Sequence, residues 1–383
     1  MLPVKRRFPA RWFPNRPVRS PQGGAQPGTP HSEIRSLRPG SPWPNRWLNV
    51  AALLAVAVSI AVVFGKNVGA QDVGGAFLNV SYDPTRELYR DLNERFALAY
   101  RHRTGKMVEI RQSHGGSSRQ ARAVADGLAA DVVTLAMYSD IDALRKRGWI
   151  APGWAGRLPN NSVPYTSTIV FVVHKGNPAA IHDWPDLVRR GVSVVTPNPK
   201  TSGNGRLSLL AAWGAVLRRG GDDDAARAYV SDLCDHVAAL DDGARDATRT
   251  FAQEGVGDVQ VTWENEAWRE AEASKGELDV VVPPVSIRAE PYVAWVDANV
   301  ERKGTRALAE AYLSFLYTDE GQEIIARNGY RPVSVEVFKK HGDRFPPVDL
   351  FPITLVAKDW ADAEARFFSE NGIFDVVCKP RAK

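Results

Sequence analysis

The chain has 383 residues, enough for two domains, and its hydrophobic fraction of 44% and charged fraction of 24% are ordinary for a globular protein. The formal net charge of +5 is unevenly placed, because residues 1–70 carry ten of the 49 basic side chains and only one of the 44 acidic ones. The 39 basic and 43 acidic side chains that remain give residues 71–383 a net charge of −4, which argues against a nucleic-acid-binding surface there.

The first 70 residues have the composition of an export leader. Residues 1–47 are basic and rich in Pro, Gly, Ser and Arg, and we expect them to be disordered. In residues 48–70, an apolar run is followed by Val68 and Ala70, which suit positions −3 and −1 of a signal peptide. The pattern predicts cleavage after Ala70 and export to the periplasm. The alternative is an uncleaved membrane anchor, because about 18 apolar residues just span a bilayer.

The chain has two cysteines, Cys234 and Cys378, and neither directly follows the signal. A lipid-modified cysteine is therefore not expected. A Cys234–Cys378 disulfide is compatible with an oxidising compartment, but the sequence leaves the pairing open. No metal-ligand spacing occurs among the seven histidines, and no cofactor is expected.

From Phe77 onwards, short apolar runs alternate with stretches of helical periodicity. The runs predict strands at residues 77–80, 108–110, 131–136, 168–173, 192–196, 259–262 and 279–282. Apolar residues at helical spacing predict helices after Asp83, after Ser118, from about Ser202 to Leu217, after Trp263 and around residues 308–315. This alternation predicts an α/β fold with open sheets.

Small and hydrogen-bonding residues gather where these strands end and helices begin. The junctions are Ser81-Tyr82-Asp83, Ser113 to Ser118, Thr201 to Asn204, and Asp241 to Arg245, with Trp263 after a further strand. Each junction alone is explained by turn and helix-cap chemistry. In open α/β sheets, however, ligands bind where strands end, and free backbone N–H groups at helix starts suit an anion.

Long stretches of the chain resemble the sulfate-binding proteins of bacterial ABC transporters. They are, in collinear order over about residues 77–350, NVSYDPTRELYRDLNERF, IRQSHGGSSRQA, DVVTLA, NNSVPYTSTIVFVVHKGNP, VSVVTPNPKTSG, WENEA and YTDEGQEI…YRP. The resemblance implies the type II periplasmic-binding-protein fold, in which two α/β lobes joined by two hinge strands close on one oxyanion. It also implies a monomer that delivers the anion to a membrane permease.

The resemblance places the lobe boundaries and the anion ligands on this sequence. It implies a first lobe from residues 76–165 and 285–383, the latter with a C-terminal tail, and a second lobe from residues 166–284. The chain then crosses between lobes near Tyr165 to Thr168 and near Pro283 to Arg288. The implied ligands are the backbone N–H groups of Asp83, Ser117, Gly203, Asn204 and Ala244, the Ser202 hydroxyl and the Trp263 indole N–H.

The implied ligand set consists only of hydrogen-bond donors. Sulfate is fully ionised at neutral pH and only accepts hydrogen bonds, so such a lining fits it. Helix N-termini stabilise the charge without a paired cation. Two residues depart from the family pattern: Asn204 stands where a second Gly is common, and Asp246 stands in place of a Gly. A carboxylate at 246 would repel a bound dianion unless it turned outward.

Three alternatives remain open. The first is a different oxyanion, thiosulfate above all, with molybdate or phosphate behind it; phosphate keeps a proton, and Asp83 is a candidate acceptor. The second is an enzyme that uses Ser113, His114 and Ser117, although neighbours in a turn rarely point at each other; Lys200-Thr201 lacks the upstream Gly of a P-loop. The third is a membrane-tethered oxyanion sensor that retains the apolar segment.

Overall fold

Two mixed β-sheets with helices on both faces form the part of the chain that the structure describes. The computed structural model describes residues 76–378. The basic leader, the apolar segment and the expected cleavage site after Ala70 lie outside these residues. No helix within residues 76–378 is both long enough and apolar enough to cross a membrane.

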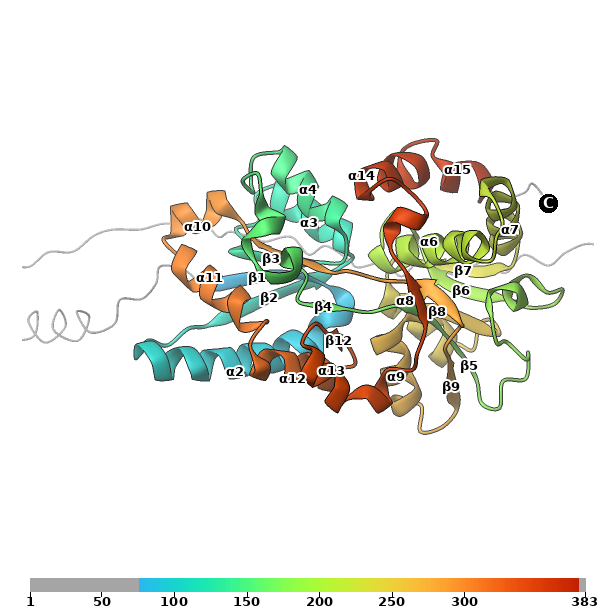
Figure 1. Ribbon diagram of the computed structural model, residues 1–383, viewed down its shortest axis with the longest axis horizontal. Coiled ribbons are helices and arrows are strands. Elements are labelled where there is room, and N and C mark those ends of the chain that lie inside the picture. Colours follow the sequence, from blue (N-terminus) through green and yellow to red (C-terminus); the bar gives the residue numbers. More distant parts are fainter. Residues whose placement is uncertain (1–75, 379–383) are drawn as a thin grey trace, which may run out of the picture. The chain divides into compact units, whose positions relative to one another are not determined.

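The first sheet has four strands in the order β11-β3-β1-β2. Its strands are β1 (Phe77–Tyr82), β2 (Ile110–Gly115), β3 (Val132–Leu135) and β11 (Tyr292–Trp295). β2 and β3 run parallel to β1, and β11 pairs antiparallel with β3. The flanking helices are α2 (Arg86–Thr104), α3 (Ser117–Ala125), α4 (Tyr138–Lys146), α10 (Asp297–Lys303), α11 (Arg306–Phe315), α12 (Asp319–Arg327) and α13 (Val335–Lys340). Figure 1 shows α3 and α4 on one side of this sheet and α2 on the other.

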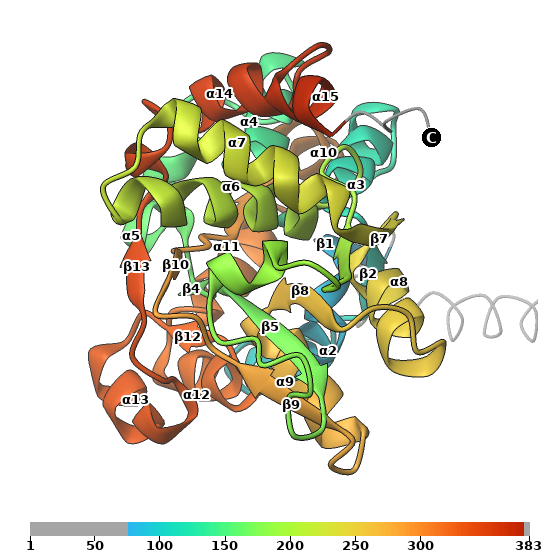
Figure 2. The same cartoon turned by 90° about the vertical axis from the view of Figure 1, so that its right-hand side faces the viewer.

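The second sheet has five strands in the order β7-β6-β8-β5-β9. Its strands are β5 (Ile169–His174), β6 (Val194–Pro197), β7 (Val237–Asp241), β8 (Val259–Trp263) and β9 (Leu278–Val281). The flanking helices are α6 (Gly203–Arg218), α7 (Asp223–Asp235), α8 (Ala244–Thr248) and α9 (Glu264–Ala273), with a π-helical turn, η4 (Arg249–Gln253), after α8. In Figure 2, α6 and α7 lie above the sheet and α9 below it.

Burial on both faces explains why these strands are continuously apolar. In β5, Phe171 and Val173 pack with α6, while Val170 and Val172 pack toward α9 and η4 on the other face. The sequence of a strand that is covered by helices on both faces is an unbroken run of hydrophobic residues, whereas a half-exposed strand alternates hydrophobic and polar residues. The α/β prediction is therefore confirmed, and most predicted strands lie within one or two residues of those observed. Neither β7 nor β11 was predicted: the residues of β7 are only partly buried or exposed, and β11, although buried, is a run of only four residues.

Three chain crossings connect the two sheets within residues 76–378, and the first two lie side by side. The first follows β4 (Tyr165–Thr166) and the second precedes β11, and there Ser167 and Ala289 exchange backbone hydrogen bonds of 3.0 and 2.9 Å. Two short ribbons flank these crossings. β4 pairs with β12 (Arg331–Pro332), and β10 (Val285–Ile287) pairs with β13 (Asp349–Phe351). The sequence prediction of crossings near 165–168 and 283–288 falls in these regions.

The C-terminal segment differs from the expectation that residues 285–383 belong to the first lobe. After β13 the chain returns to the second sheet, where η6 (Ile353–Leu355), α14 (Trp360–Ala363), the π-helical turn η7 (Glu364–Phe368) and α15 (Ile373–Val377) pack over α6 and α7. The rings of Trp213 and Phe367 meet edge to face at 4.9 Å. Cys378 forms a disulfide with Cys234 of α7, which settles the pairing that the sequence left open. Figures 1 and 2 both show α14 and α15 above α6 and α7.

Candidate functional site

One small cavity lies where strand ends of both sheets meet the starts of the helices that follow them. Its volume is about 10 Å³, far below the about 300–1,000 Å³ of pockets for drug-sized molecules, so it suits a ligand of only a few atoms. All seven residues expected as ligands line it: Asp83, Ser117, Ser202, Gly203, Asn204, Ala244 and Trp263. The other lining residues are Tyr82, Pro84, Gly115, Gly116 and Gly243.

Five helical segments begin at this cavity, and no side chain caps any of them. They are the 3₁₀ turn η1 (Asp83–Thr85), α3, α6, α8 and α9, whose N-cap residues are Tyr82, Gly116, Ser202, Gly243 and Trp263. The first N–H groups of a helix have no acceptor inside the helix. Their partial positive charges therefore converge on the cavity, which makes it a site for an anion.

The indole of Trp263 supplies a buried donor without an acceptor. The side chain is fully buried, and its Nε1 forms no hydrogen bond within residues 76–378. Its ring packs on that of Tyr82 with centroids 5.6 Å apart, which fixes its orientation across the sheet boundary. A buried donor left unpaired costs about 1–3 kcal/mol. The position of this N–H at the cavity is explained if a ligand oxygen accepts from it.

The two serines of the cavity differ in what they have left to donate. The Ser117 hydroxyl donates to Asp140 Oδ2 at 2.5 Å and accepts from the Ala136 N–H at 3.0 Å, so only its backbone N–H is free for a ligand. The Ser202 hydroxyl, by contrast, has no hydrogen-bond partner among the described side chains and backbone groups. This is the division that the resemblance implied, a backbone donor at Ser117 and a hydroxyl donor at Ser202.

Two glycines permit the two sides of the cavity to approach this closely. A Cβ on Gly203 would lie 2.7 Å from the Ala136 Cβ, and one on Gly116 would lie 2.7 Å from the Thr201 carbonyl oxygen. Neither distance is tolerated by a real side chain, so the close packing of the lobes requires glycine at both positions.

Asn204 keeps its side chain out of the cavity. Its Nδ2 donates to Thr262 Oγ1 at 3.2 Å, and its Oδ1 accepts from Ser208 Oγ at 3.2 Å. The side chain is thus held between α6 and the second sheet, and the backbone N–H remains at the cavity. Replacing a glycine by asparagine here therefore leaves the donor in place and ties α6 to β8.

The carboxylate of Asp246 lies at the edge of the cavity, where a Cβ on Gly243 would be 3.6 Å from its Oδ2, and it is paired with a cation. Its side chain is 43% exposed and lies 3.4 Å from Arg249 of the same helical segment. Asp83, whose carboxylate borders the cavity near Gly243, is paired with Arg86 at 2.8 Å. Both negative charges are thus compensated by neighbouring guanidinium groups, which weakens the repulsion of a dianion that the sequence raised as a concern.

No lysine or arginine lines the cavity, because the nearby cations are paired with other groups. Arg206 donates to the Pro199 carbonyl at 3.0 Å and to Glu364 at 2.8 Å. Arg245 pairs with Glu87 at 2.7 Å. Although partial burial raises the pKa of Glu87, the hydrogen bond from Arg245 and the charge of Arg269 hold it below its usual value. The Coulomb attraction for an anion at this site therefore comes mainly from backbone dipoles.

The residues of the enzyme alternative do not form a catalytic pair. Ser113 and His114 occupy successive positions of β2, so their side chains point to opposite faces, and Ser113 is bonded to Gln120 at 3.2 Å. Burial lowers the pKa of His114 to about 4. Within residues 76–378, no group of three or more His, Cys, Asp or Glu side chains is placed to hold a metal ion.

Sequence reasoning did not single out Tyr82, Gly116 or Gly243 as site residues, although it flagged the junctions that contain them. Each is the N-cap of a helical segment and directly precedes a residue that was named. The sequence feature that identifies these three residues is their position just before a helix start. Sequence periodicity locates a helix start only to within a few residues, so it could not single them out.

Comparison with known proteins gives one family and several near relatives. The family model for bacterial extracellular solute-binding proteins matches residues 79–331. The chain is 53% identical over 304 residues to the sulfate-binding protein of Salmonella typhimurium. These residues make up 79% of this chain and 92% of the relative. It is 49% identical over 332 residues to the thiosulfate-binding protein of Pseudomonas aeruginosa, and this alignment covers 86% of this chain and 98% of the relative. The solved structure of the sulfate-binding protein SubI from Mycobacterium tuberculosis aligns with a TM-score of 0.70 at 31% identity, covering 77% of this chain and 99% of SubI.

Proposed function

Since the chain belongs to the bacterial extracellular solute-binding proteins and has their two-lobed type II fold, we propose that it captures one sulfate dianion in the cavity between its lobes. It then delivers this anion to the permease of an ABC transporter. The seven ligands are Asp83, Ser117, Ser202, Gly203, Asn204, Ala244 and Trp263, in the donor roles that the resemblance implied. The protein acts as an exported monomer, cleaved after Ala70, in the periplasm.

The observation that carries this proposal is the unpaired indole N–H of Trp263 in a cavity lined by helix starts. An indole N–H only donates, and so do the backbone groups and the Ser202 hydroxyl in this setting. A ligand that accepts at every oxygen satisfies all of them, and sulfate does so at any physiological pH. A protonated phosphate needs one acceptor, and the cavity offers it Asp83 Oδ2, since only Oδ1 is bonded to Arg86; the large excess of donors over this single acceptor favours sulfate.

Thiosulfate is the second candidate, because relatives named for each anion are about equally similar to this chain. Thiosulfate replaces one oxygen by sulfur, which is larger and a weaker acceptor. The donor-rich lining favours sulfate, because all four of its outer atoms are good acceptors.

Titration calorimetry of the protein purified from the periplasm tests the proposal. We expect saturable one-to-one binding of sulfate, weaker binding of thiosulfate and none of phosphate at neutral pH. At about a hundred times its dissociation constant, sulfate should add roughly 2.7 kcal/mol to the free energy of unfolding. Equal binding of sulfate and phosphate, or binding of neither, contradicts the proposed specificity. N-terminal sequencing of the same sample tests cleavage after Ala70 and the membrane-tethered alternative.

A further inference from the structure

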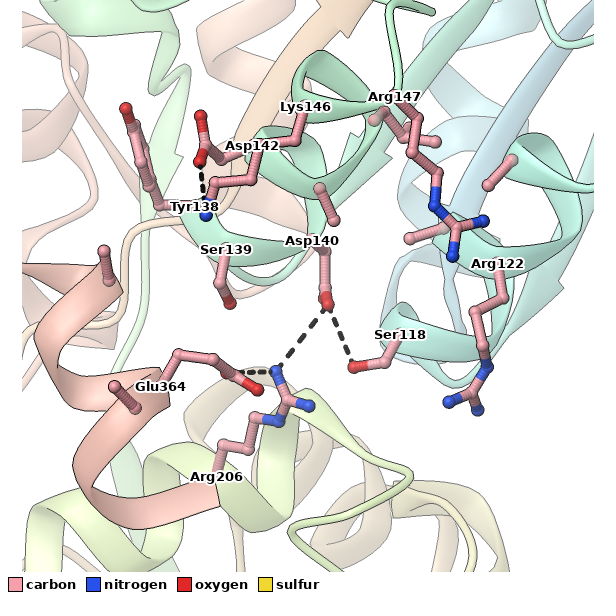
Figure 3. Close-up of a pocket in the computed structure, with 16 residues that line it drawn as sticks. Ser118, Arg122, Tyr138, Ser139, Asp140, Asp142, Lys146, Arg147, Arg206 and Glu364 are labelled. Carbon is pink, nitrogen blue, oxygen red and sulfur yellow. Dashed lines mark hydrogen bonds and ion pairs between the residues drawn. The ribbon is translucent and has the colours of Figure 1, made fainter. Parts of the chain in front are cut away.

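A second and much larger hollow lies beside the anion cavity, and the proposed ligands leave it unused. We call it the interlobe groove; its volume is about 390 Å³. One wall consists of α3 and α4 of the first lobe, and the other consists of Arg206 on α6 with Ala361, Glu364 and Ala365 of the C-terminal segment (Figure 3). Small side chains are among the lining residues, including Ala121, Ala125 and Ala143.

Charged groups deep in the groove neutralise one another. Asp140 accepts from Ser118 at 2.9 Å and lies 3.7 Å from Arg206, which also binds Glu364 at 2.8 Å. Asp142 is paired with Arg145 and Lys146 of its own helix. These contacts close the polar network between the lobes and leave no net charge at the bottom of the groove.

The rim on the first lobe carries two exposed arginines, of which Arg122 has no partner in residues 76–378 and Arg147 pairs with an exposed carboxylate. Arg122 is exposed, and its guanidinium forms no ion pair or hydrogen bond within the part of the chain that the structure describes. Arg147 is also exposed, and its nearest carboxylate, Asp126, lies 3.8 Å away. In Figure 3, both Arg122 and Arg147 lie on the right-hand side of the view, and both line the groove. Two exposed arginines at one rim stand out because residues 71–383 have a net negative charge.

The groove exists only while the lobes are closed, and it is linked to the anion cavity. Ser117 borders the cavity with its backbone and donates its hydroxyl to Asp140, which in turn faces Arg206 across the groove. Separating the lobes would remove one wall of the groove and break the contact between Asp140 and Arg206. An occupant of the groove therefore distinguishes the loaded from the empty protein.

We propose that the interlobe groove is the docking site for an acidic segment of the membrane permease, which thereby recognises the closed protein. This rests on the proposed function. The occupant presents carboxylates to Arg122 and Arg147 and small apolar side chains to the alanines that line the groove. The volume matches that of pockets that take a few side chains, and complementary charge at a rim speeds association and sets its register.

The experiment measures sulfate uptake by proteoliposomes that contain the organism's sulfate permease and its ATPase, driven by limiting purified binding protein. The test variant is the double charge reversal Arg122→Glu with Arg147→Glu. Both arginines are exposed and neither lines the anion cavity. The dissociation constant of the double variant for sulfate should therefore stay within about twofold of the wild-type value. Uptake should fall about tenfold or more, because like charges then oppose each other at the rim.

Two further variants separate the groove from general effects of charge. Arg101→Glu with Lys106→Glu makes the same change of charge on exposed residues at the far end of α2, and uptake should stay at the wild-type level. Ala365→Trp fills the groove from the opposite wall without changing charge, and since Ala365 is exposed the fold should be retained. Uptake by this variant should fall while sulfate binding persists.

The outcomes distinguish the groove from the sulfate site. Full uptake by the Arg122→Glu, Arg147→Glu protein, or an equal loss in the α2 control, overturns the docking proposal. So does a photo-crosslinker at position 361 that captures a second copy of this chain instead of a permease subunit in the presence of sulfate. If the wild-type protein binds no sulfate in calorimetry, the proposed function itself fails, and the docking proposal fails with it.

Discussion

At the scale of single residues, Trp263 offers the sharpest separation between packing and ligand binding. Its ring is fully buried and would stabilise the fold whatever its N–H does. Replacing Trp263 by Phe keeps most of the apolar volume and removes only the donor. Hydrogen bonds to charged groups contribute about 1.5–3 kcal/mol, so sulfate affinity should fall roughly tenfold to a hundredfold in calorimetry.

Trp268 provides a matched control for this substitution. Its Nε1 is also buried without a partner within residues 76–378, but it does not line the cavity. Trp268→Phe should therefore leave sulfate affinity unchanged. A Trp263→Phe protein that loses stability while it binds sulfate as tightly as wild type would show that the indole only packs.

Residue types at the strand–helix junctions marked the region of the cavity, and the family resemblance named the seven residues that line it. Each of the seven lies at the end of a strand or within a residue or two of a helix start, and strand ends gather at one edge of an open α/β sheet. The orientation of side chains was not predictable in the same way. Asp246 faces Arg249 and Asn204 faces Thr262 because of neighbours that only the packed structure brings close.

At the scale of elements, the C-terminal segment shows where sequence reasoning fails. Its apolar residues, among them Trp360 and Phe367, occur in short irregular turns without a helical or alternating period. Periodicity therefore says nothing about which sheet they cover, and packing decides it: they complete the core above α6 and α7. The disulfide from Cys378 to Cys234 then fixes the last turn to α7.

This disulfide should contribute measurably to stability. It joins residues separated by 144 positions, and cross-linking so long a loop restricts the unfolded chain, which is worth about 2–5 kcal/mol. Replacing both Cys234 and Cys378 by Ser should lower the urea midpoint by the corresponding amount. Adding a reductant should lower the midpoint of the wild-type protein to the same value, and identical midpoints in all three samples would contradict the expectation.

Helix α9 carries a buried carboxyl group that makes stability depend on pH. Burial raises the pKa of Glu270 to about 8, and the nearby charge of Glu266 adds to this. Its Oε1 accepts from Thr248 and from Gln260, while Oε2 has no partner among the described groups. The folded protein therefore holds a proton that the unfolded chain releases near its ordinary pKa.

The sign of the effect follows from this difference. The contribution of Glu270 to stability is complete below about pH 4.5, and it is lost as the pH rises toward 8. The Gln side chain of the Glu270→Gln variant does not ionise. The free energy of unfolding of this variant should therefore rise relative to that of wild type as the pH is raised across this window. Glu272→Gln, on the exposed face of the same helix, should show no such trend in urea melts at pH 5, 6.5 and 8. A constant difference between Glu270→Gln and wild type would contradict the assignment.

At the scale of the whole folded part, the contacts between the lobes describe a closed state. Arg331 forms two hydrogen bonds of 2.7 Å with Glu264 at the start of α9, and both side chains are buried. On another side of the boundary, Glu87 of α2 pairs with Arg245 and Arg269. Within residues 76–378, the two lobes are joined covalently only where the chain crosses from one to the other. The backbone bridge between Ser167 and Ala289 lies beside two of these crossings. Such an arrangement favours opening by hinge bending about the crossings when the anion leaves.

Gly203→Ala tests this closure directly. The new Cβ would lie 2.7 Å from the Ala136 Cβ across the lobe boundary when the lobes are closed, and the clash disappears when they separate. Overpacking of this kind costs about 1–3 kcal/mol, so sulfate affinity should fall roughly tenfold, since about 1.4 kcal/mol corresponds to that factor. Stability without sulfate should not fall, because Ala is the better residue at the start of α6.

Small-angle scattering separates this account from simple damage to the fold. Wild-type protein should show a smaller radius of gyration when saturated with sulfate than without it. Gly203→Ala should have the wild-type radius without sulfate and should compact only at much higher sulfate concentrations. Gly342→Ala, where the added Cβ meets no atom within 4 Å, should behave as wild type. Compaction of wild type and Gly203→Ala at the same sulfate concentration would contradict this account. It would mean that the closed lobes accommodate the added Cβ, so that the approach of Gly203 to Ala136 does not control closure.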